Sequence, residues 1–243
     1  MATKSKYKQI IDAIFPKNIT CDLCGLETFD GSNLCKECLK TITFNNGVTC
    51  PVCGRKTARP EICGECKADA PKYKKGVSAL VYDKGGARLV LRFKNGKEYL
   101  ADYFGELLAK KVKELPPCDF ITFVPLTKKK EYDRGFNQGR LLAKELSQRI
   151  DIPVKEVLKK KRDTNDQKRL SRRDRAENLK GVFQIIDRDA CKGKNILLVD
   201  DVLTTGATAD EVTRELKIAG AKAVYFATVA SVEYKQKTEI DEI

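Results

Sequence analysis

Residues 195–208 read Asn-Ile-Leu-Leu-Val-Asp-Asp-Val-Leu-Thr-Thr-Gly-Ala-Thr, and this stretch decides the fold. Its apolar run, Ile196 to Val199, predicts a buried parallel strand with two carboxylates at its end. A Thr/Gly turn follows, and then a helix whose apolar positions include Val212, Leu216 and Ala219. Ligands of open α/β sheets bind where strands end and helices begin, so this stretch predicts a ligand site.

The turn itself predicts a phosphate site, because its backbone N–H groups and the helix N-terminus both attract an anion. It consists of Thr204, Thr205, Gly206, Ala207 and Thr208. Asp200 and Asp201 cannot hold phosphate unless a cation intervenes, so they either accept hydrogen bonds from sugar hydroxyls or hold Mg²⁺. The alternative is an ordinary strand–helix turn with threonine as the N-cap. The complete pattern favours the ligand site.

The composition fits one large domain with a smaller one. The chain has 243 residues, of which 42% are apolar, enough for a substantial core. It holds no run of eighteen apolar residues, so no transmembrane helix is expected. The basic first residues are not followed by a long apolar segment, which argues against a secretory signal. We therefore predict a cytoplasmic protein, and leave open a peripheral position at the inner face of the membrane.

The net charge of +13 suggests polyanionic partners, such as phosphorylated ligands or nucleic acid. A lysine-rich solvated surface would give the same total, so charge alone does not identify the partner. The chain has no histidine. Proton transfer must therefore use Asp, Glu, Lys, Tyr or the substrate, and a metal site must use cysteines or carboxylates.

Eight of the ten cysteines form four Cys-x-x-Cys pairs in an internal repeat. The pairs are Cys21 and Cys24, Cys35 and Cys38, Cys50 and Cys53, and Cys63 and Cys66. Each such knuckle places two thiolates on one face of a tight turn, and two knuckles close a tetrahedral Cys₄ zinc site. The sequence thus predicts about two structural Zn²⁺ ions. It does not decide which pairs share each ion.

Cysteine pairs can also form disulfides, iron–sulfur clusters or redox sites. Disulfides are disfavoured because no secretory signal is found. An iron–sulfur cluster usually shows a tighter run of cysteines, and a thioredoxin-type redox site needs only one pair near a βαβ pattern. Zinc remains the preferred interpretation.

The remaining pattern alternates strands and helices. Strands are predicted at 76–82, 120–125 and 223–230, a turn at 83–86, and helices at 87–96, 99–112 and from about 141. Residues 154–171 are the least ordered in pattern, and a short strand is expected around 181–183. Such alternation predicts an α/β fold.

Residues 196–208 resemble the 5-phosphoribosyl-1-pyrophosphate (PRPP) motif of type I phosphoribosyltransferases. Together with the cysteine pairs and Arg-Gly-Phe-Asn-Gln at 134–138, they make the chain resemble the ComF family of competence proteins. This resemblance implies a type I phosphoribosyltransferase fold, with a central, mainly parallel sheet flanked by helices, and a small N-terminal zinc-ribbon module. The implied domains are an N-terminal helix at 1–17, a double zinc ribbon at 18–70 and a phosphoribosyltransferase domain at 71–243.

The resemblance also implies roles for individual residues. Asp200 and Asp201 would be the catalytic acids and would bind the ribose hydroxyls of PRPP, with the 5′-phosphate in the turn at 204–208. Arg134 and Gln138 lie in the loop that faces the pyrophosphate, and Mg²⁺ would accompany PRPP. Residues 154–171 correspond to the flexible hood loop that covers the active site in related transferases.

The family resemblance implies a part in natural transformation, in the uptake and handling of single-stranded DNA, with a competence helicase as an associate. We expect weak DNA binding through the basic stretches 128–130 and 159–173. Two alternatives stay open. One is an active cytoplasmic phosphoribosyltransferase with an unknown acceptor, and the other is a non-catalytic PRPP sensor or DNA-binding module on a transferase fold.

Overall fold

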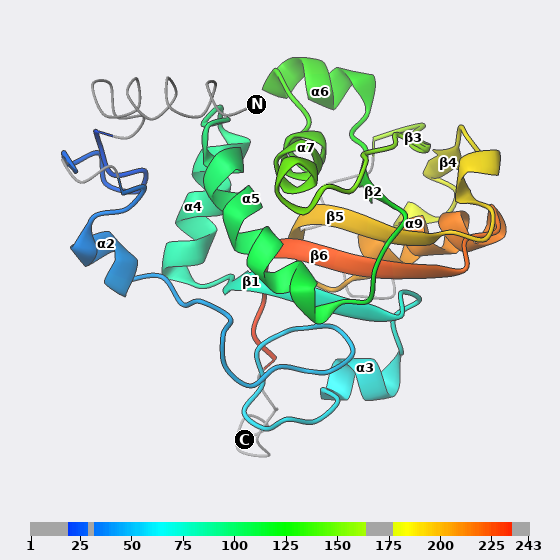
Figure 1. Cartoon of the computed structure of the whole chain (residues 1–243), viewed down its shortest axis with the longest axis horizontal. Helices are drawn as coiled ribbons and strands as arrows, with labels where there is room; N and C mark the ends of the chain where they lie inside the picture. Colours follow the sequence, from blue (N-terminus) through cyan, green and yellow to red (C-terminus); the bar gives the residue numbers. More distant parts are fainter. Residues whose placement is uncertain (1–18, 29–31, 164–176, 235–243) are drawn as a thin grey trace. The chain divides into compact units, whose positions relative to one another are not determined.

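A computed structural model describes residues 19–28, 32–163 and 177–234 (Figure 1). The chain divides into two compact units, Met1–Ile42 and Thr43–Ile243, each of which is described by itself. The helix predicted at 1–17 lies outside the described residues. The domain boundaries predicted at 17/18 and 70/71 stay predictions.

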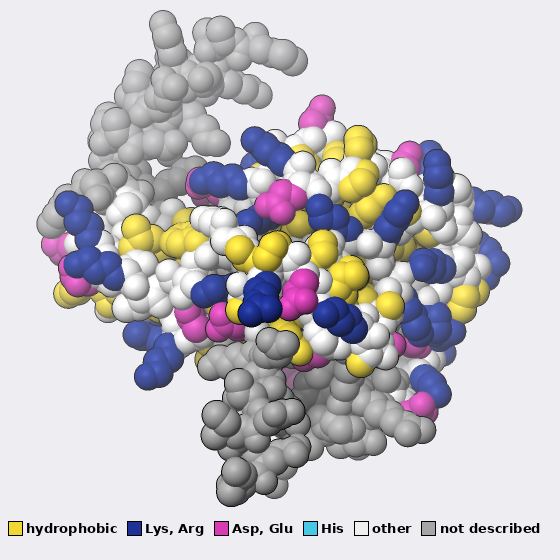
Figure 2. Space-filling model, turned by 90° about the horizontal axis from the view of Figure 1, so that it is seen from below, with side chains coloured by type: hydrophobic (Ala, Val, Ile, Leu, Met, Phe, Trp, Pro, Cys, Tyr) yellow, Lys and Arg dark blue, Asp and Glu magenta, His cyan; other side chains and the backbone are white. Residues whose placement is uncertain are grey.

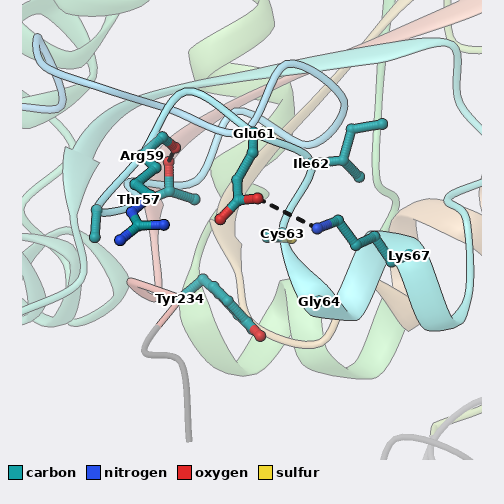
Figure 3. A pocket seen from close by; sticks show the side chains of 9 residues that line it. Thr57, Arg59, Glu61, Ile62, Cys63, Gly64, Lys67 and Tyr234 are labelled. Carbon is teal, nitrogen blue, oxygen red and sulfur yellow. Dashed lines mark hydrogen bonds and ion pairs between the residues drawn. The ribbon is translucent and has the colours of Figure 1, made fainter. Parts of the chain in front are cut away.

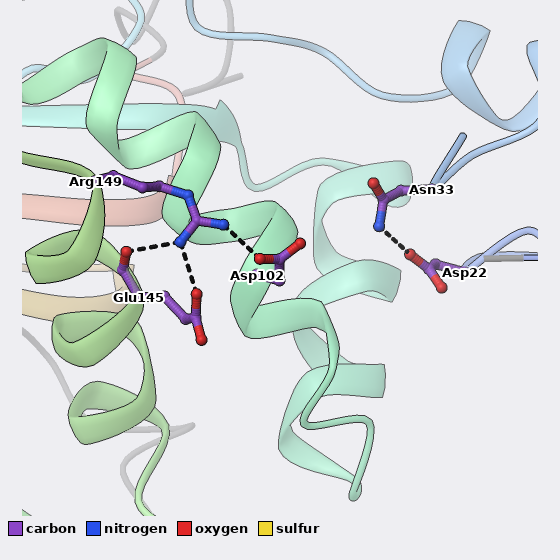
Figure 4. Close-up of polar contacts among 5 residues, drawn as sticks. All are labelled: Asp22, Asn33, Asp102, Glu145 and Arg149. Carbon is purple, nitrogen blue, oxygen red and sulfur yellow. Dashed lines mark hydrogen bonds and ion pairs between the residues drawn. The ribbon is translucent and has the colours of Figure 1, made fainter. Parts of the chain in front are cut away.

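The described part of the first unit is organised by its cysteines. An antiparallel bridge between Thr20 and Glu27 closes its first knuckle, and the short helix α2 (Lys36–Lys40) carries the second. The Asn33 amide donates a hydrogen bond of 3.0 Å to the Asp22 carboxylate (Figure 4). A unit this small rarely buries enough apolar surface to be stable alone, so we expect a metal ion held by its cysteines to supply stability.

The second unit is built on a four-stranded parallel sheet with the order β1-β6-β5-β2 (Figure 1). Its strands are β1 (Lys75–Val81), β2 (Phe120–Phe123), β5 (Asn195–Leu203) and β6 (Ala223–Ser231). Val199 of β5 lies opposite Phe123 of β2 and Ala227 of β6. The sheet confirms the predicted α/β fold class.

Within the described part of the second unit, a group of three helices packs on one face of this sheet, and another helix packs on the other face (Figure 1). The first group comprises α4 (Lys84–Lys94), α5 (Leu100–Lys111) and α7 (Gln138–Ile150), and α9 (Ala207–Ile218) lies on the opposite face. The ring of Phe93 in α4 lies 5.4 Å from that of Phe104 in α5 and 5.7 Å from that of Phe136. Arg149 of α7 pairs with Asp102 of α5 and with Glu145 (Figure 4). Aromatic packing and these ion pairs thus hold the three helices together.

The second zinc-ribbon repeat packs into the core on the α9 face. This segment includes the short helix α3 (Gly64–Ala68), and its four cysteines belong to one apolar cluster with Leu198, Phe226 and Leu216. Gly54 approaches Gly76 of β1 so closely that a Cβ atom there would lie 2.4 Å from the Gly76 carbonyl oxygen. The φ angle of Gly54, +72°, also requires glycine. The second repeat is therefore part of the same body as the sheet.

Most predicted strands and helices are confirmed, but the turn predicted at 83–86 is wrong. The Asp83 carboxylate accepts a hydrogen bond of 3.0 Å from the Gly86 N–H group and caps α4, so helix begins at Lys84. Short 3₁₀ turns follow α5 at Val112–Glu114 and precede β5 at Asp189–Cys191.

Two further elements lie in segments that the sequence marked as loops. The basic stretch after β2 contains helix α6 (Lys128–Arg134), and Thr127 caps it. The segment with the least ordered pattern contributes β3 (Leu158–Lys160), which pairs antiparallel with β4 (Phe183–Ile185). Residues 164–176 between these strands lie outside the described part of the chain. Among the described residues, no helix has the length and apolar character needed to cross a membrane.

Candidate functional site

The acidic pair lies near the carboxyl end of β5. Strand β5 continues past Asp200 and Asp201 to Leu203, four residues beyond the predicted apolar run, and the turn at 204–206 leads directly into α9. Gly206 caps α9 with a φ angle of +87°, a left-handed conformation that side chains disfavour. The predicted acids, turn and helix start therefore form one continuous segment.

Asp200 is half-buried and holds its proton unusually strongly. Burial raises the pKa of its carboxyl to about 7, and repulsion from Asp201 adds to this rise. The Asp201 N–H group donates a 2.8 Å hydrogen bond to Asp200 and partly opposes it. The Nζ atom of Lys94, in the last turn of α4, lies 3.1 Å from a carboxylate oxygen of Asp201. Sequence reasoning missed Lys94, because no local signal places a helix-end lysine against a distant strand.

The predicted pyrophosphate-facing residues lie beside this strand end. The Val124 N–H group donates to the Val199 carbonyl at 3.1 Å, which aligns the end of β2 with that of β5. After α6, the guanidinium of Arg134 donates to the Gln138 side-chain oxygen at 3.2 Å. Arg134 is exposed, whereas Gln138 is buried at the start of α7. The structure thus brings the two predicted residues into contact with each other, Arg134 at the end of α6 and Gln138 at the start of α7.

The two basic stretches meet in one cavity of about 730 Å³. Its charged lining consists of Lys128, Lys129, Glu131, Arg140, Glu156, Lys159, Lys160, Lys161, Arg162 and Asp163. We call it the basic cleft. The Thr127 hydroxyl donates a 2.6 Å hydrogen bond to Asp163, joining the start of α6 to the end of the β3 segment. The predicted basic residues from 164 to 173 lie outside the described part of the chain.

Lys160 connects the basic cleft to the acidic pair electrostatically. Burial lowers the pKa of its amine, and repulsion from Lys130 lowers it further. Attraction to Asp163 and Asp200 opposes this fall, and Arg134 also repels the amine. Lys160 therefore lies within electrostatic reach of both predicted halves of the site, although no sequence motif marked it individually.

Positive charge is not confined to the basic cleft. On the face shown in Figure 2, Lys and Arg side chains are spread widely, with Asp and Glu side chains among them. The high net charge is therefore partly an ordinary solvated surface, as the sequence allowed.

The cysteine knuckles form two groups that fit zinc. Cys21, Cys24, Cys35 and Cys38 form one group, and Cys50, Cys53, Cys63 and Cys66 form the other. Within each group the sulfur atoms lie within 4.8 Å of one another. The Cys24–Cys35 and Cys53–Cys63 sulfur pairs are 3.8 Å apart, the separation of about 3.8 Å expected from Zn–S bonds in a tetrahedron. Each repeat therefore closes its own site, which settles the pairing that the sequence left open.

The thiols of the second group strongly influence one another. Hydrogen bonds from Cys53 and Cys66 lower the pKa of Cys50, whereas the contacts with Cys50 and Cys53 raise the pKa of Cys66. Four thiolates at such distances repel one another unless a cation lies between them. All ten cysteines are free thiols, so disulfides do not explain the knuckles.

A smaller cavity of about 220 Å³ lies at the edge of the second repeat (Figure 3). Glu61 and Lys67 pair across it at 3.3 Å, and Tyr234 forms another wall. The Tyr234 hydroxyl occupies the space where a side chain at Gly64 would project. This cavity is smaller than the roughly 300 Å³ of typical ligand pockets.

Comparison with known families agrees with this architecture. A phosphoribosyl transferase domain matches residues 137–242, and a double zinc ribbon domain matches residues 10–67. The chain is thus a phosphoribosyltransferase-fold protein with an N-terminal double zinc ribbon.

The relatives identify the family. Competence protein F of Haemophilus influenzae is 30% identical over 206 residues, which cover 79% of this chain and 88% of that protein. The DNA utilization protein YhgH of Escherichia coli K12 is 31% identical over 84% of this chain and 93% of its own length. Competence protein ComFC of Bacillus subtilis is 28% identical over 72% of each chain. The chain belongs to the ComF family.

Several solved structures of phosphoribosyltransferases are similar to part of the chain. Purine phosphoribosyltransferase from Pyrococcus horikoshii is 26% identical, with a TM-score of 0.38 over 58% of this chain and 79% of that one. Glutamine PRPP amidotransferase from B. subtilis is 21% identical, with a TM-score of 0.39 over 54% of this chain and 26% of that one.

The cysteine geometry predicts about two Zn²⁺ ions per chain, with four ligands each. Elemental analysis of the purified, reduced protein checks this number.

Cys21→Ser should lower zinc content by about one ion and leave the second unit folded, because the two sites use separate cysteines. Cys50→Ser should also lower thermal stability of the second unit, because its thiol lies in that core. Iron, or a folded metal-free protein, would contradict the zinc sites.

The raised pKa of Asp200 predicts that its ionisation destabilises the fold. The native state keeps a proton that the unfolded chain releases, so this group's contribution to stability is present below about pH 4 and lost as pH rises through about 7. Asp200→Asn should therefore raise the free energy of unfolding at pH 8 and change it little at pH 4. Urea unfolding at both pH values measures this difference.

The exposed Asp189→Asn is the matched control for Asp200→Asn and should change neither measurement. If Asp200→Asn has the same effect at both pH values, Asp200 does not titrate as described.

Proposed function

We propose that the carboxyl end of β5 binds PRPP in a Mg²⁺-dependent manner. One observation carries the proposal: an acidic pair and a helix-starting turn lie at the end of the strand, beside a basic loop from the neighbouring strand. The turn offers backbone N–H groups to a phosphate, and the carboxylates offer acceptors to ribose hydroxyls. This arrangement matches the three chemically different parts of PRPP.

Each part of PRPP would be bound by different residues. Thr204 to Thr208 would hold the 5′-phosphate, and Asp200 and Asp201 would hold the ribose. Arg134 and Gln138 would face the pyrophosphate together with Lys160, and Mg²⁺ would partly neutralise the charge of the pyrophosphate when bound. Lys94 would leave or share its contact with Asp201 when the ribose hydroxyls arrive, since both need the same carboxylate.

Transfer of the phosphoribosyl group to an acceptor is a separate step. Its transition state would carry positive charge on the ribose while pyrophosphate leaves, so cations on the leaving group would matter most. Binding without transfer would make the protein a PRPP sensor. The transferase and the sensor require the same PRPP-binding site. They differ in whether an acceptor receives the phosphoribosyl group.

Binding of PRPP with Mg²⁺ is tested by isothermal titration calorimetry. The wild type should bind, and Asp200→Ala with Asp201→Ala should lose roughly a hundredfold in affinity, because both carboxyl groups that accept from the ribose hydroxyls are removed. Asp189→Ala is the matched control, because Asp189 is an exposed acid in the turn before β5. Equal binding by the wild type and the double variant would place the site elsewhere.

A second proposal concerns single-stranded DNA. Its support is that two basic stretches, remote in sequence, line one cleft. The names of the relatives, competence protein and DNA utilization protein, also support a role with DNA. We infer a role in handling single-stranded DNA during natural transformation, in the cytoplasm, with a competence helicase as an associate. The aromatic residue Tyr132 is 88% exposed on α6 and offers a stacking surface.

Weak DNA binding that depends on salt is the expected outcome. Fluorescence anisotropy with a labelled oligonucleotide should show affinity falling steeply as salt rises, because binding releases counterions. Charge reversal of Lys159, Lys160, Lys161 and Arg162 should weaken binding about tenfold or more at low salt.

The matched control reverses four exposed lysines elsewhere: Lys110, Lys192, Lys217 and Lys222. It has the same net charge as the cleft variant, so a smaller loss would assign the effect to the cleft. Equal losses would make the binding a property of net charge, and no binding at low salt would leave DNA handling to a partner.

A further inference from the structure

Arg55 of the second repeat reaches the turn that follows β5. Its side chain is only 4% exposed. One guanidinium nitrogen, Nη2, donates to the backbone carbonyl of Thr204, and the other, Nη1, lies 2.9 Å from the Glu65 carboxylate. Thr204 is the first residue of that turn. A buried cation thus bridges the cysteine module and the proposed phosphate site.

The second cysteine group positions both Arg55 and its partner Glu65. Arg55 follows the Cys53 knuckle, and its carbonyl accepts a 2.8 Å hydrogen bond from the Cys50 N–H group. Glu65 lies in α3 between Cys63 and Cys66. Closing the four-cysteine site therefore fixes the position of the guanidinium as well as that of its carboxylate partner.

A hydrogen bond at the Thr204 carbonyl also fixes the neighbouring N–H group. In a trans peptide the C=O and N–H bonds point in opposite directions across a rigid plane. Arg55 holds the carbonyl toward the ribbon, so the N–H group of Thr205 points away from the ribbon. The second attachment is nearby, because the Asp210 side chain in the first turn of α9 accepts a 2.8 Å hydrogen bond from the Lys72 N–H group. The ribbon thus constrains the turn through Arg55, and the segment that follows the ribbon constrains the helix start through Lys72.

The matching position of the first repeat carries a different residue. The order Cys-x-x-Cys-Gly places Leu26 where the second repeat has Arg55. Leu26 is 66% exposed and has no guanidinium to donate, whereas Arg55 is buried. The bridge is therefore a feature of the second repeat and not of the knuckle as such.

We propose that Arg55 is a positioning residue that holds the turn at 204–206 ready for a phosphate monoester. The inference rests on the proposed PRPP site and deepens it, because it connects phosphate affinity to the second cysteine group. Arg55 does not touch the ligand. It acts by orienting the backbone groups that do.

The test compares Arg55→Met with Arg59→Met, which changes an exposed arginine of the same repeat. Calorimetry with ribose 5-phosphate and with Mg²⁺–pyrophosphate reports the two ends of the site separately. Arg55→Met should lose roughly tenfold in affinity for ribose 5-phosphate and keep its affinity for pyrophosphate, because only the turn at 204–206 is released. Arg59→Met should match the wild type with both probes.

Hydrogen exchange of the ligand-free full chain provides a second readout. Backbone amides at 204–208 should exchange faster in Arg55→Met and at the wild-type rate in Arg59→Met. Unchanged exchange and unchanged ribose 5-phosphate affinity would overturn the proposal, as would equal losses for both probes. If the wild type binds no PRPP, the proposed function fails, and the exchange comparison alone decides the role of Arg55.

Arg55→Lys keeps the test decisive if Arg55→Met loses zinc. A single ammonium cannot donate to Glu65 and the Thr204 carbonyl in the forked geometry of arginine. Arg55→Lys with wild-type zinc content should still show faster exchange at 204–208. Exchange at the wild-type rate in this variant would overturn the proposal.

Discussion

The parallel pairing of β5 with both β2 and β6 is the constraint on which the rest of the second unit depends. It aligns the ends of the strands at one edge, so the acids after Val199 and the loop after Phe123 meet there. A shift of one residue in register would turn Asp200 to the opposite face of the sheet. The position of β5 thus defines the site. The surrounding side chains come from other segments, namely α4, α6, β3 and the second repeat.

Local patterns in the sequence predicted the parts of this site that lie on one element. An apolar run, two acids and a Thr/Gly turn specify a strand, its end and a helix start, because each signal concerns neighbouring residues. The cysteine spacing specified the metal sites for the same reason. Helix α6 escaped prediction because Lys128–Arg134 has no apolar face, although Thr127 was a usable cap signal. The three-residue strand β3 escaped because its only support is a partner far along the chain.

The residues that the sequence could not reveal are those whose role depends on tertiary neighbours. Nothing in the sequence distinguishes Lys94, Lys160 and Arg55 from other basic residues. Each of them interacts with a group on another element: Lys94 with Asp201, Lys160 with Asp200, and Arg55 with the Thr204 carbonyl. The two repeats resemble each other in sequence, because each has two Cys-x-x-Cys knuckles with a similar gap between them. Their different burial appears only in the fold, where the second repeat packs among the side chains of β5, β6 and α9.

The unequal burial of the two cysteine groups has a kinetic consequence. All four cysteines of the second group are buried, whereas in the first group Cys24 is exposed and Cys35 is partly exposed. Ligand exchange at a metal requires an incoming group to reach a sulfur or the ion itself, so solvent access sets its rate. A metal ion at the first site is therefore expected to exchange faster than one at the second site, whose four cysteines lie in the core.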